Sequence, residues 1–214
     1  MDASAASHVS VVRPGIAERL WDAAKTEFSH RGYHGARVQG IARRASCNVA
    51  LLYRHWASKK ALYVDILRHV WQSQAKQVVA LLDRDQGAPA VVGAYLDALL
   101  GDSVGAQIIV RELLDGGPFL TQLIESEPDL IMSSRVAAEH MAAAGNGDAT
   151  KALRPGVDPA LTAITIGGIA SLVASASQTA RLFLGRDYTP QGWRDHLYDI
   201  LLHGLVPCPP AEPK

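Results

Sequence analysis

The sequence has few of the features that mark a secreted or metal-binding protein. It contains only two cysteines, Cys47 and Cys208, and neither lies in a metal-ligand spacing. We therefore expect reduced thiols and a cytoplasmic location. The first twelve residues have no basic start and no long apolar run, so we expect no secretory signal there. The formal net charge is zero, which taken alone argues against a nucleic-acid partner.

Motifs for catalysis and cofactor binding are also missing. The sequence has no G-x-S-x-G elbow, no Walker phosphate loop, no H-E-x-x-H helix and no paired carboxylates in a motif. We therefore predict that the protein is not an enzyme and has no catalytic residue, no metal and no cofactor. An enzyme that lacks a recognisable motif is the chief alternative class.

No apolar run is free of polar interruptions over the length of a membrane span. The nearest candidate is the segment 159–180, which has no charged residue but contains seven Ser, Thr or Gln side chains. We interpret it as a buried helix rich in small residues and expect no membrane partner. A membrane span is the alternative.

Charge is divided unevenly along the chain even though its sum is zero. Residues 1–60 carry ten Lys or Arg and four Asp or Glu, whereas residues 61–214 carry eleven and seventeen. A basic module fused to an acidic body is typical of a nucleic-acid binder with a separate second domain. Chance clustering in an ordinary protein is the alternative explanation.

The chain lacks any long alternating strand pattern, and almost every segment has helical spacing. We therefore predict an all-α fold. Gly32 is expected to end the first helix in a left-handed conformation. Asp158-Pro159 and Thr189-Pro190 each combine an N-cap with a proline at the first helical position. The predicted helices span residues 16–31, 38–45, 49–55, 59–83, 89–100, 105–115, 119–143, 159–184 and 190–205.

Two short helices stand close together within "IARRASCNVALLYRHWASKKAL". The turn between them is too short for the helices to lie antiparallel, and Asn48 is a good N-cap for the second. We expect Leu52 and Trp56 to pack against Phe28. The inward face of the first helix is predicted to consist of Val38, Ile41, Ala42 and Ala45.

The stretch "AAKTEFSHRGYHGARVQGIARRASCNVALLYRHWASKKAL" resembles the DNA-binding module of the tetracycline-repressor (TetR) family of bacterial regulators. The pattern covers about residues 16–62 without a gap. The resemblance implies a three-helix helix-turn-helix DNA-binding domain over residues 14–60. It also implies a larger helical effector-binding and dimerisation domain over residues 61–206. Tails are predicted at 1–13 and 207–214.

The resemblance implies that Tyr53 and Lys59 contact phosphates and that His55 and Arg37 also reach the DNA. A helix-turn-helix presents the start of its second helix to base edges, and the small side chains there permit a close approach to the groove. Arginines can replace the phosphate contact of a threonine that the family usually has where this chain has Leu51. The predicted DNA-binding residues are Arg37, Arg43, Val49, Ala50, Leu51, Tyr53, His55 and Lys59.

The segments 159–184 and 190–205 are predicted to form a homodimer. The first is rich in Gly, Ala and Ser, and the pair can build a four-helix bundle with the same pair from a second subunit. A small-molecule effector, neutral or largely apolar, is expected in a helical pocket. The candidate ligand-binding residues are Trp71, Tyr95, Gln107, Arg111, His140, Met141 and Gln178.

Together these features predict a sequence-specific DNA-binding transcriptional regulator. We expect a ligand-released repressor that binds a near-palindromic, double-stranded operator as a homodimer. The second alternative is a helical interaction or small-molecule-binding protein without specific DNA binding, in which the helix-turn-helix serves only as scaffold.

Overall fold

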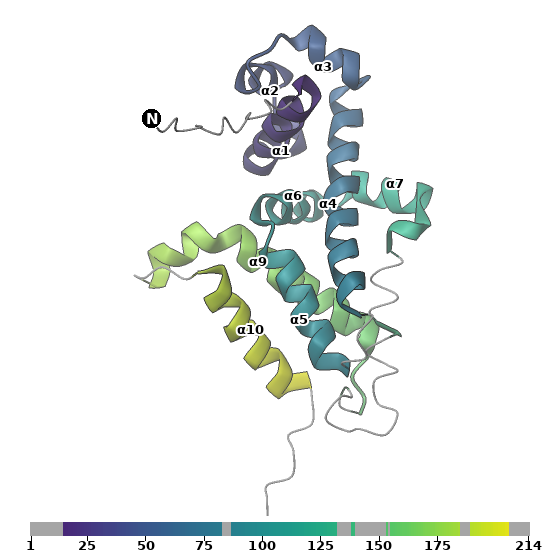
Figure 1. Cartoon of the computed structure of the whole chain (residues 1–214), viewed down its shortest axis with the longest axis vertical. Coiled ribbons are helices and arrows are strands. Elements are labelled where there is room, and N and C mark those ends of the chain that lie inside the picture. The colour runs from purple at the N-terminus through teal and green to yellow at the C-terminus, as the bar shows by residue number, and fades with distance from the viewer. Residues whose placement is uncertain are drawn as a thin grey trace, which may run out of the picture.

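The computed structural model describes residues 15–82, 87–131, 138–139, 153, 155–184 and 189–205. Within these ranges, residues 78–79, 81–82, 87, 131, 176–184 and 204–205 are described by their backbone alone. Every regular element in the described part is helical, which confirms the predicted all-α class (Figure 1). The elements are α1 (Ile16–Gly35), α2 (Val38–Arg44), α3 (Val49–His55), α4 (Lys59–Leu82), α5 (Gly87–Leu100), α6 (Ser103–Leu114), α7 (Pro118–Ser126), the 3-10 helix η1 (Pro128–Ile131), α9 (Pro159–Leu184) and α10 (Pro190–Leu205).

Helices α1, α2 and α3 form a module at one end of the molecule, and α4 runs from it along the body (Figure 1). The predicted cap of α3 is present, and α4 has a cap as well. The Asn48 side chain accepts a hydrogen bond from the Leu51 amide at 2.9 Å, and the Ser58 hydroxyl accepts one from the Ala61 amide at 3.0 Å. These bonds satisfy amides that the first turns of α3 and α4 leave without a helical partner.

The end of α1 is sharply bent at Gly32. This residue has φ +63°, as expected, but its ψ of −177° is extended, and a short helical turn continues to Gly35. The Ala36 amide donates to the Gly32 carbonyl at 3.2 Å. A left-handed φ is also found at Ser46, at +52°, in the turn between α2 and α3. A side chain there raises the energy of the turn relative to glycine.

Two hydrophobic cores lie on either side of α6. The first joins α1–α3 to α4 and α7, and its largest fully buried side chains include Phe28, Tyr63 and Ile41. The second joins α5, α9 and α10, and it consists mostly of alanine, valine and leucine. Helix α6 packs against both α1 and α9, so it connects the two cores.

One predicted helix is wrong in its extent. The segment 119–143 was expected to be continuous, but α7 ends at Ser126 and the short helix η1 begins at Pro128. Proline removes an amide donor and its ring clashes with the preceding turn, so the α-helix cannot pass this point. Glu127 at the break has φ −134° and ψ 72°, outside the helical region.

Helix α9 includes the whole segment 159–180, for which a membrane span was the alternative. None of the helices in the described ranges combines the length and the hydropathy needed to cross a bilayer. The Asp158 side chain caps α9 as predicted, because it accepts hydrogen bonds from the amides of Ala160 and Leu161. The Thr189 hydroxyl likewise accepts from the Gly192 amide at the start of α10.

Candidate nucleic-acid interface and its connection to the body

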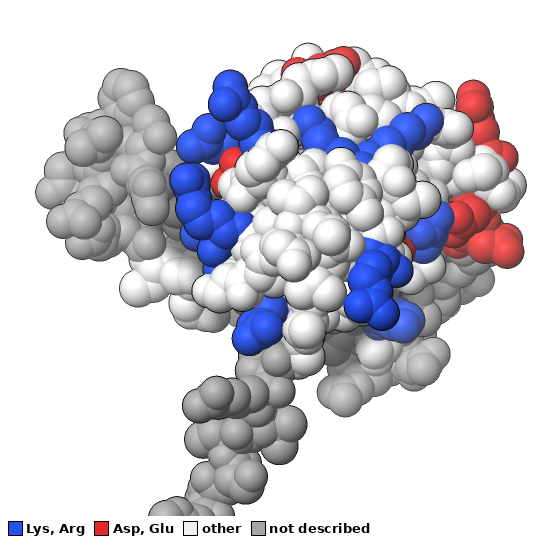
Figure 2. Space-filling model, turned by 90° about the horizontal axis from the view of Figure 1, so that it is seen from above, with Lys and Arg blue, Asp and Glu red and all other residues white. Residues whose placement is uncertain are grey.

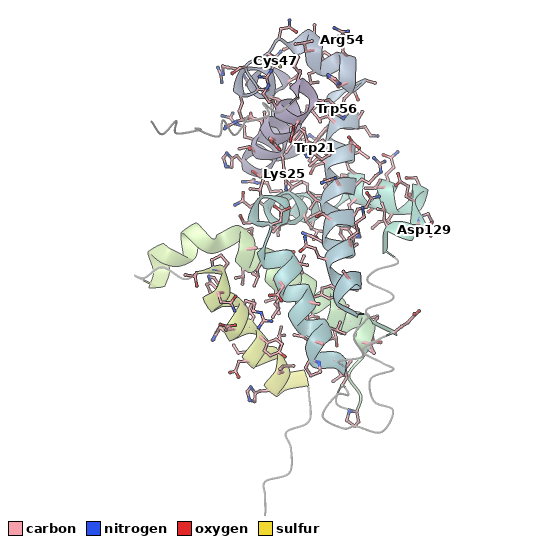
Figure 3. The ribbon with its side chains drawn as sticks, viewed as in Figure 1. Trp21, Lys25, Cys47, Arg54, Trp56 and Asp129 are labelled. Carbon is pink, nitrogen blue, oxygen red and sulfur yellow. The ribbon has the colours of Figure 1, made fainter. Side chains whose placement is uncertain are left out.

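Helix α3 presents one face to solvent at the tip of the molecule, where Arg54 is labelled in Figure 3. Its inward residue Leu52 is fully buried beside Phe28, as predicted. Ala50, Arg54 and His55 are exposed, and Tyr53 keeps 49% of its surface accessible. Val49 and Leu51 are half-buried at the edge of this face. The predicted contact residues of α3 therefore lie on an accessible helix whose back is held by the core.

Basic side chains surround this end of the molecule. Arg37 is the exposed residue before α2, and Arg43 and Arg44 are exposed in its last turn. Figure 2 shows Lys and Arg side chains around a largely uncharged centre at this end. Such an arrangement attracts a polyanion whatever its sequence.

Lys59 has a structural role that the sequence did not indicate. Its ammonium donates to the Ala36 carbonyl at 2.8 Å and lies 4.6 Å from the centre of the Tyr33 ring. Burial lowers its pKa from the ordinary lysine value. Lys59 thereby fastens the start of α4 to the corner between α1 and α2. Its contact with a phosphate stays a prediction. Two protons of the ammonium group remain available to donate to a phosphate oxygen.

Aromatic contacts fasten the other end of α3. The ring centres of Trp21 and Trp56 are 6.4 Å apart, and both are labelled on the side of α1 toward α4 in Figure 3. The Trp56 indole donates to Asp65 of α4 at 3.0 Å. Asp65 in turn accepts from Arg68, which binds both carboxylate oxygens of Glu127 at 3.0 Å. A polar chain therefore connects the end of α3 with the break between α7 and η1.

Glu112 of α6 is the most buried carboxylate in the described part of the chain, with 1% of its surface exposed. It accepts the Tyr63 hydroxyl at 3.0 Å and the amides of Phe119 and Leu120 at 2.7 and 2.9 Å. Burial and the neighbouring carboxylate raise the pKa of Tyr63 well above its usual range. Glu112 therefore caps α7 and joins α4, α6 and α7 at one point.

Sequence reasoning missed Glu112, although the spacing contained a signal. Ile108, Ile109 and Glu112 lie at helical spacing on one buried stripe of α6. A single acidic residue on an apolar stripe indicates a buried carboxylate that accepts hydrogen bonds, because burying a charge without such partners is costly. Nothing in the linear sequence, however, identifies Tyr63 or the start of α7 as those donors.

Helix α6 is also bonded directly to α1. Lys25 forms an ion pair with Asp102, the cap of α6, at 2.8 Å, and the Arg111 guanidinium donates to the Ser29 carbonyl at 2.7 Å. Asp102 meanwhile accepts from the Gly105 amide. These bonds connect the three-helix module to the helix that contacts both cores.

The predicted ligand-binding residues whose side chains the structure describes lie at different places in the fold. Trp71 donates to the Leu130 carbonyl at 2.8 Å beside the first core, whereas Tyr95 is buried in the second. Gln107 is half-buried on α6, and Arg111 is bonded to α1. His140 and Met141 lie outside the described residues, as does the side chain of Gln178. Their role as a ligand pocket remains a prediction.

Comparison with known proteins agrees with this arrangement. Residues 20–66 match the family model described as bacterial regulatory proteins, tetR family. The chain is 38% identical over 95 residues to the transcriptional activator FasR of Mycolicibacterium smegmatis, covering 42% of this chain and 43% of FasR. It is 29% identical over 114 residues to the transcriptional repressor NicS of Pseudomonas putida, covering 50% of this chain and 54% of NicS. The chain thus spans about half the length of these relatives.

Solved structures share the fold over nearly the whole chain. The ketosteroid transcriptional regulator KstR2 of Mycobacterium tuberculosis has a TM-score of 0.68 at 18% identity, covering 92% of this chain and 97% of KstR2. The regulator FadR of Bacillus subtilis, solved with stearoyl-CoA, has a TM-score of 0.63 at 16% identity, covering 87% and 97%. At these identities the likeness concerns the fold. The family model is matched over residues 20–66, from α1 into the start of α4, so the three-helix module is similar to that of the tetR family of bacterial regulatory proteins.

Proposed function

We propose that the protein is a sequence-specific DNA-binding transcriptional regulator that acts in the cytoplasm. The observation that carries the proposal is α3, a short capped helix with a buried back and with exposed side chains at Ala50, Tyr53 and His55. Its first turn can approach base edges because the side chains there are small. The arginines around it supply the sequence-independent attraction to phosphates.

The proposed active form is a homodimer through α9 and α10. In the single chain, α9 exposes Leu161 at 64%, Ile164 at 70% and Leu172 at 58%, and α10 exposes Ile200. An atom added at Gly168 on α9 meets no other side chain within 4 Å. A contiguous apolar face of this kind is covered in soluble proteins by a partner. A two-fold axis would give two copies of α3, which suit a near-palindromic operator with half-sites about one helical turn apart.

The proposed regulation is release from DNA by a small, largely apolar effector bound in the helical body. Two structural neighbours are a ketosteroid regulator and a regulator solved with stearoyl-CoA, which supports an apolar ligand class. The contacts of α6 provide a route for coupling, because Glu112, Asp102 and Arg111 bond this helix to α7, α1 and α4. Effector and operator affinities would then be coupled reciprocally.

The experiment that tests DNA recognition starts from an unbiased selection. Purified protein is incubated with sheared genomic DNA of its host, and the retained fragments are sequenced after washing at moderate salt. We expect enrichment of a near-palindrome. Tyr53→Ala should lower the affinity for that duplex at least about tenfold, since a lost charge-assisted contact is worth about 1.5 kcal/mol or more.

A matched variant separates recognition from folding. Tyr53 is half-exposed, so Tyr53→Ala should leave the unfolding temperature nearly unchanged. Tyr53→Phe removes only the hydroxyl and should retain the ring packing. Comparing its affinity with that of Tyr53→Ala divides the loss of affinity between the hydroxyl and the ring. If the folded, dimeric wild-type protein enriches no sequence, the helix-turn-helix serves as scaffold in an interaction or ligand-binding protein.

A further inference from the structure

A cleft on the three-helix module has a different composition from the face of α3. It has a volume of about 480 Å³ and lies between the end of α1 and the outer side of α2. No residue of α3 contributes to its lining. The residues around the cleft are Glu27, Arg31, Arg37, Gln39, Gly40, Arg43 and Arg44.

The charges in the cleft do not balance. Glu27 is 6% exposed, and one of its oxygens forms an ion pair with the Arg31 Nε at 3.2 Å. Within the described residues, no carboxylate lies within ion-pairing distance of Arg37, Arg43 or Arg44. Four guanidinium groups thus share one buried carboxylate. An anion that enters the cleft would reduce the electrostatic repulsion among these guanidinium groups.

Gly40 gives the cleft its depth. An atom added as Cβ at this position would lie 3.0 Å from a Glu27 oxygen, closer than ordinary contact. The Glu27 carboxylate therefore occupies the space that a side chain at position 40 would take. From there it holds Arg31 at the rim, so that Arg31 of α1 and the arginines of α2 point to the same opening.

We propose that this cleft binds phosphate groups of the DNA backbone outside the stretch contacted by α3. The proposal rests on the DNA-binding function proposed above. It assigns phosphate contact to Arg31 and Arg44, in addition to Arg37 and Arg43. The planar guanidinium donates two parallel hydrogen bonds to phosphate oxygens, and the open, polar cleft has no aromatic ring on which a base would stack. Glu27 weakens the attraction and so limits affinity for DNA of any sequence.

The test measures the salt dependence of binding to a mixed-sequence duplex of about three helical turns, between about 50 and 200 mM KCl. Each phosphate neutralised contributes about 0.9 to the slope of log affinity against log salt. Arg44→Gln should lower the slope by about this amount. The matched control is Lys76→Gln, which removes one exposed charge from α4 outside the module and should leave the slope nearly unchanged.

A second variant has the opposite expected sign. Glu27→Gln keeps the size of the side chain and removes its charge, so affinity for the same duplex should rise several-fold at low salt. Partial unfolding would lower affinity, and a rise therefore cannot come from a damaged fold. Unchanged or lower affinity in folded Glu27→Gln contradicts the cleft as a phosphate site.

The remaining outcomes separate this proposal from the one on which it rests. If the wild-type protein binds the duplex and Arg44→Gln behaves as Lys76→Gln does, the cleft is not in contact with DNA, while DNA binding by α3 stands. If the wild-type protein binds no duplex at low salt, the proposed function fails and the cleft assignment fails with it. Calorimetry with inorganic pyrophosphate tests whether the cleft binds a free phosphate compound in place of the DNA backbone. Binding that Arg44→Gln abolishes, with no change in the duplex slope, would overturn the DNA assignment.

Discussion

The two cores of the molecule are built from different side chains. The first, around α1–α4 and α7, contains a cluster of Phe28, Tyr33, Tyr63 and Phe119 whose ring centres are 4.3 to 5.3 Å apart. Buried polar groups such as Glu112 fix its helices through bonds with defined partners. The second core, around α5, α9 and α10, has mostly alanine, valine and leucine and fewer large rings.

The outer faces of the two regions differ in the same way. In the described part of α1–α4 and α7, the exposed large apolar side chains are Ile16 at 40% and Tyr53 at 49%, and they lie on different helices. Beside the second core, α9 keeps Leu161, Ile164 and Leu172 exposed. The first region is therefore complete within one chain and held in a single geometry. The second has apolar surface left over, which supports the homodimer proposed through α9 and α10.

Breaking the α9 face should have the largest effect. Ile164→Lys places a charge at the centre of the proposed interface, so we expect the dimer to dissociate and operator affinity to fall by two orders of magnitude or more, since burying an unpaired charge costs several kcal/mol. The measurement is molar mass by sedimentation or light scattering. Leu114→Lys is the control, because Leu114 is 81% exposed on α6 and should leave the mass unchanged. A dimer that persists in Ile164→Lys contradicts this interface.

Removing Glu112 tests the polar connections of the first core. Glu112→Ala leaves the Tyr63 hydroxyl and two amides of α7 without an acceptor, so we expect the free energy of unfolding to fall by about 3 kcal/mol. Denaturant titration measures it. Glu125→Ala removes an exposed carboxylate from α7 and should change stability by less than about 0.5 kcal/mol. Equal effects of the two variants would mean that Glu112 does not fix these helices.

Replacing Ser46 in the turn between α2 and α3 tests whether the first region stores backbone strain. Ser46 has φ +52°, where a side chain costs about 1 kcal/mol and glycine does not. Glycine also loses more freedom on folding, so Ser46→Gly should stabilise the protein by about 0.5 kcal/mol. Ser73→Gly, in the interior of α4, should lower stability by a similar amount. The same sign for both variants in thermal unfolding would contradict the strain at Ser46.

A similarly small effect is expected for the pair between Arg68 and Glu127. The hydrogen bond from Arg68 holds the pKa of Glu127 below its usual range. A lowered carboxyl pKa stabilises the fold above the pKa of the unfolded chain, and this stability is lost as pH falls through the lowered value. The pair is partly exposed, so we expect only about 0.5 kcal/mol. The difference in unfolding free energy between wild type and Glu127→Gln should shrink between about pH 5 and pH 3. A constant difference contradicts the ion pair.

Local signals in the sequence predicted most helices and their caps. Asn48, Asp158 and Thr189 cap the helices that they were expected to cap, because an N-cap depends only on residues a few positions away. The same local reasoning was wrong at Pro128, because the predicted helix 119–143 continued through a proline that ends an α-helix. The inward face of α2 and the burial of Leu52 were also predicted correctly from helical spacing.

The contacts between distant helices were not predictable in this way. Glu112 is bonded to Tyr63, which is 49 positions away, and Lys59 to the Ala36 carbonyl, 23 positions away. Such pairs depend on how the helices are arranged in space, which a single sequence does not specify. The cleft around Glu27 is another example, because its arginines come from two helices and its depth depends on Gly40.

The most direct test of the account is a hydroxyl-radical footprint of the dimer on the duplex enriched from genomic DNA. Two copies of α3 related by a two-fold axis predict two protected patches, symmetric about the centre and about 10 base pairs apart. The same footprint with Tyr53→Ala should lose both patches together. A single patch, or uniform protection along the duplex, would contradict a dimer that reads two half-sites.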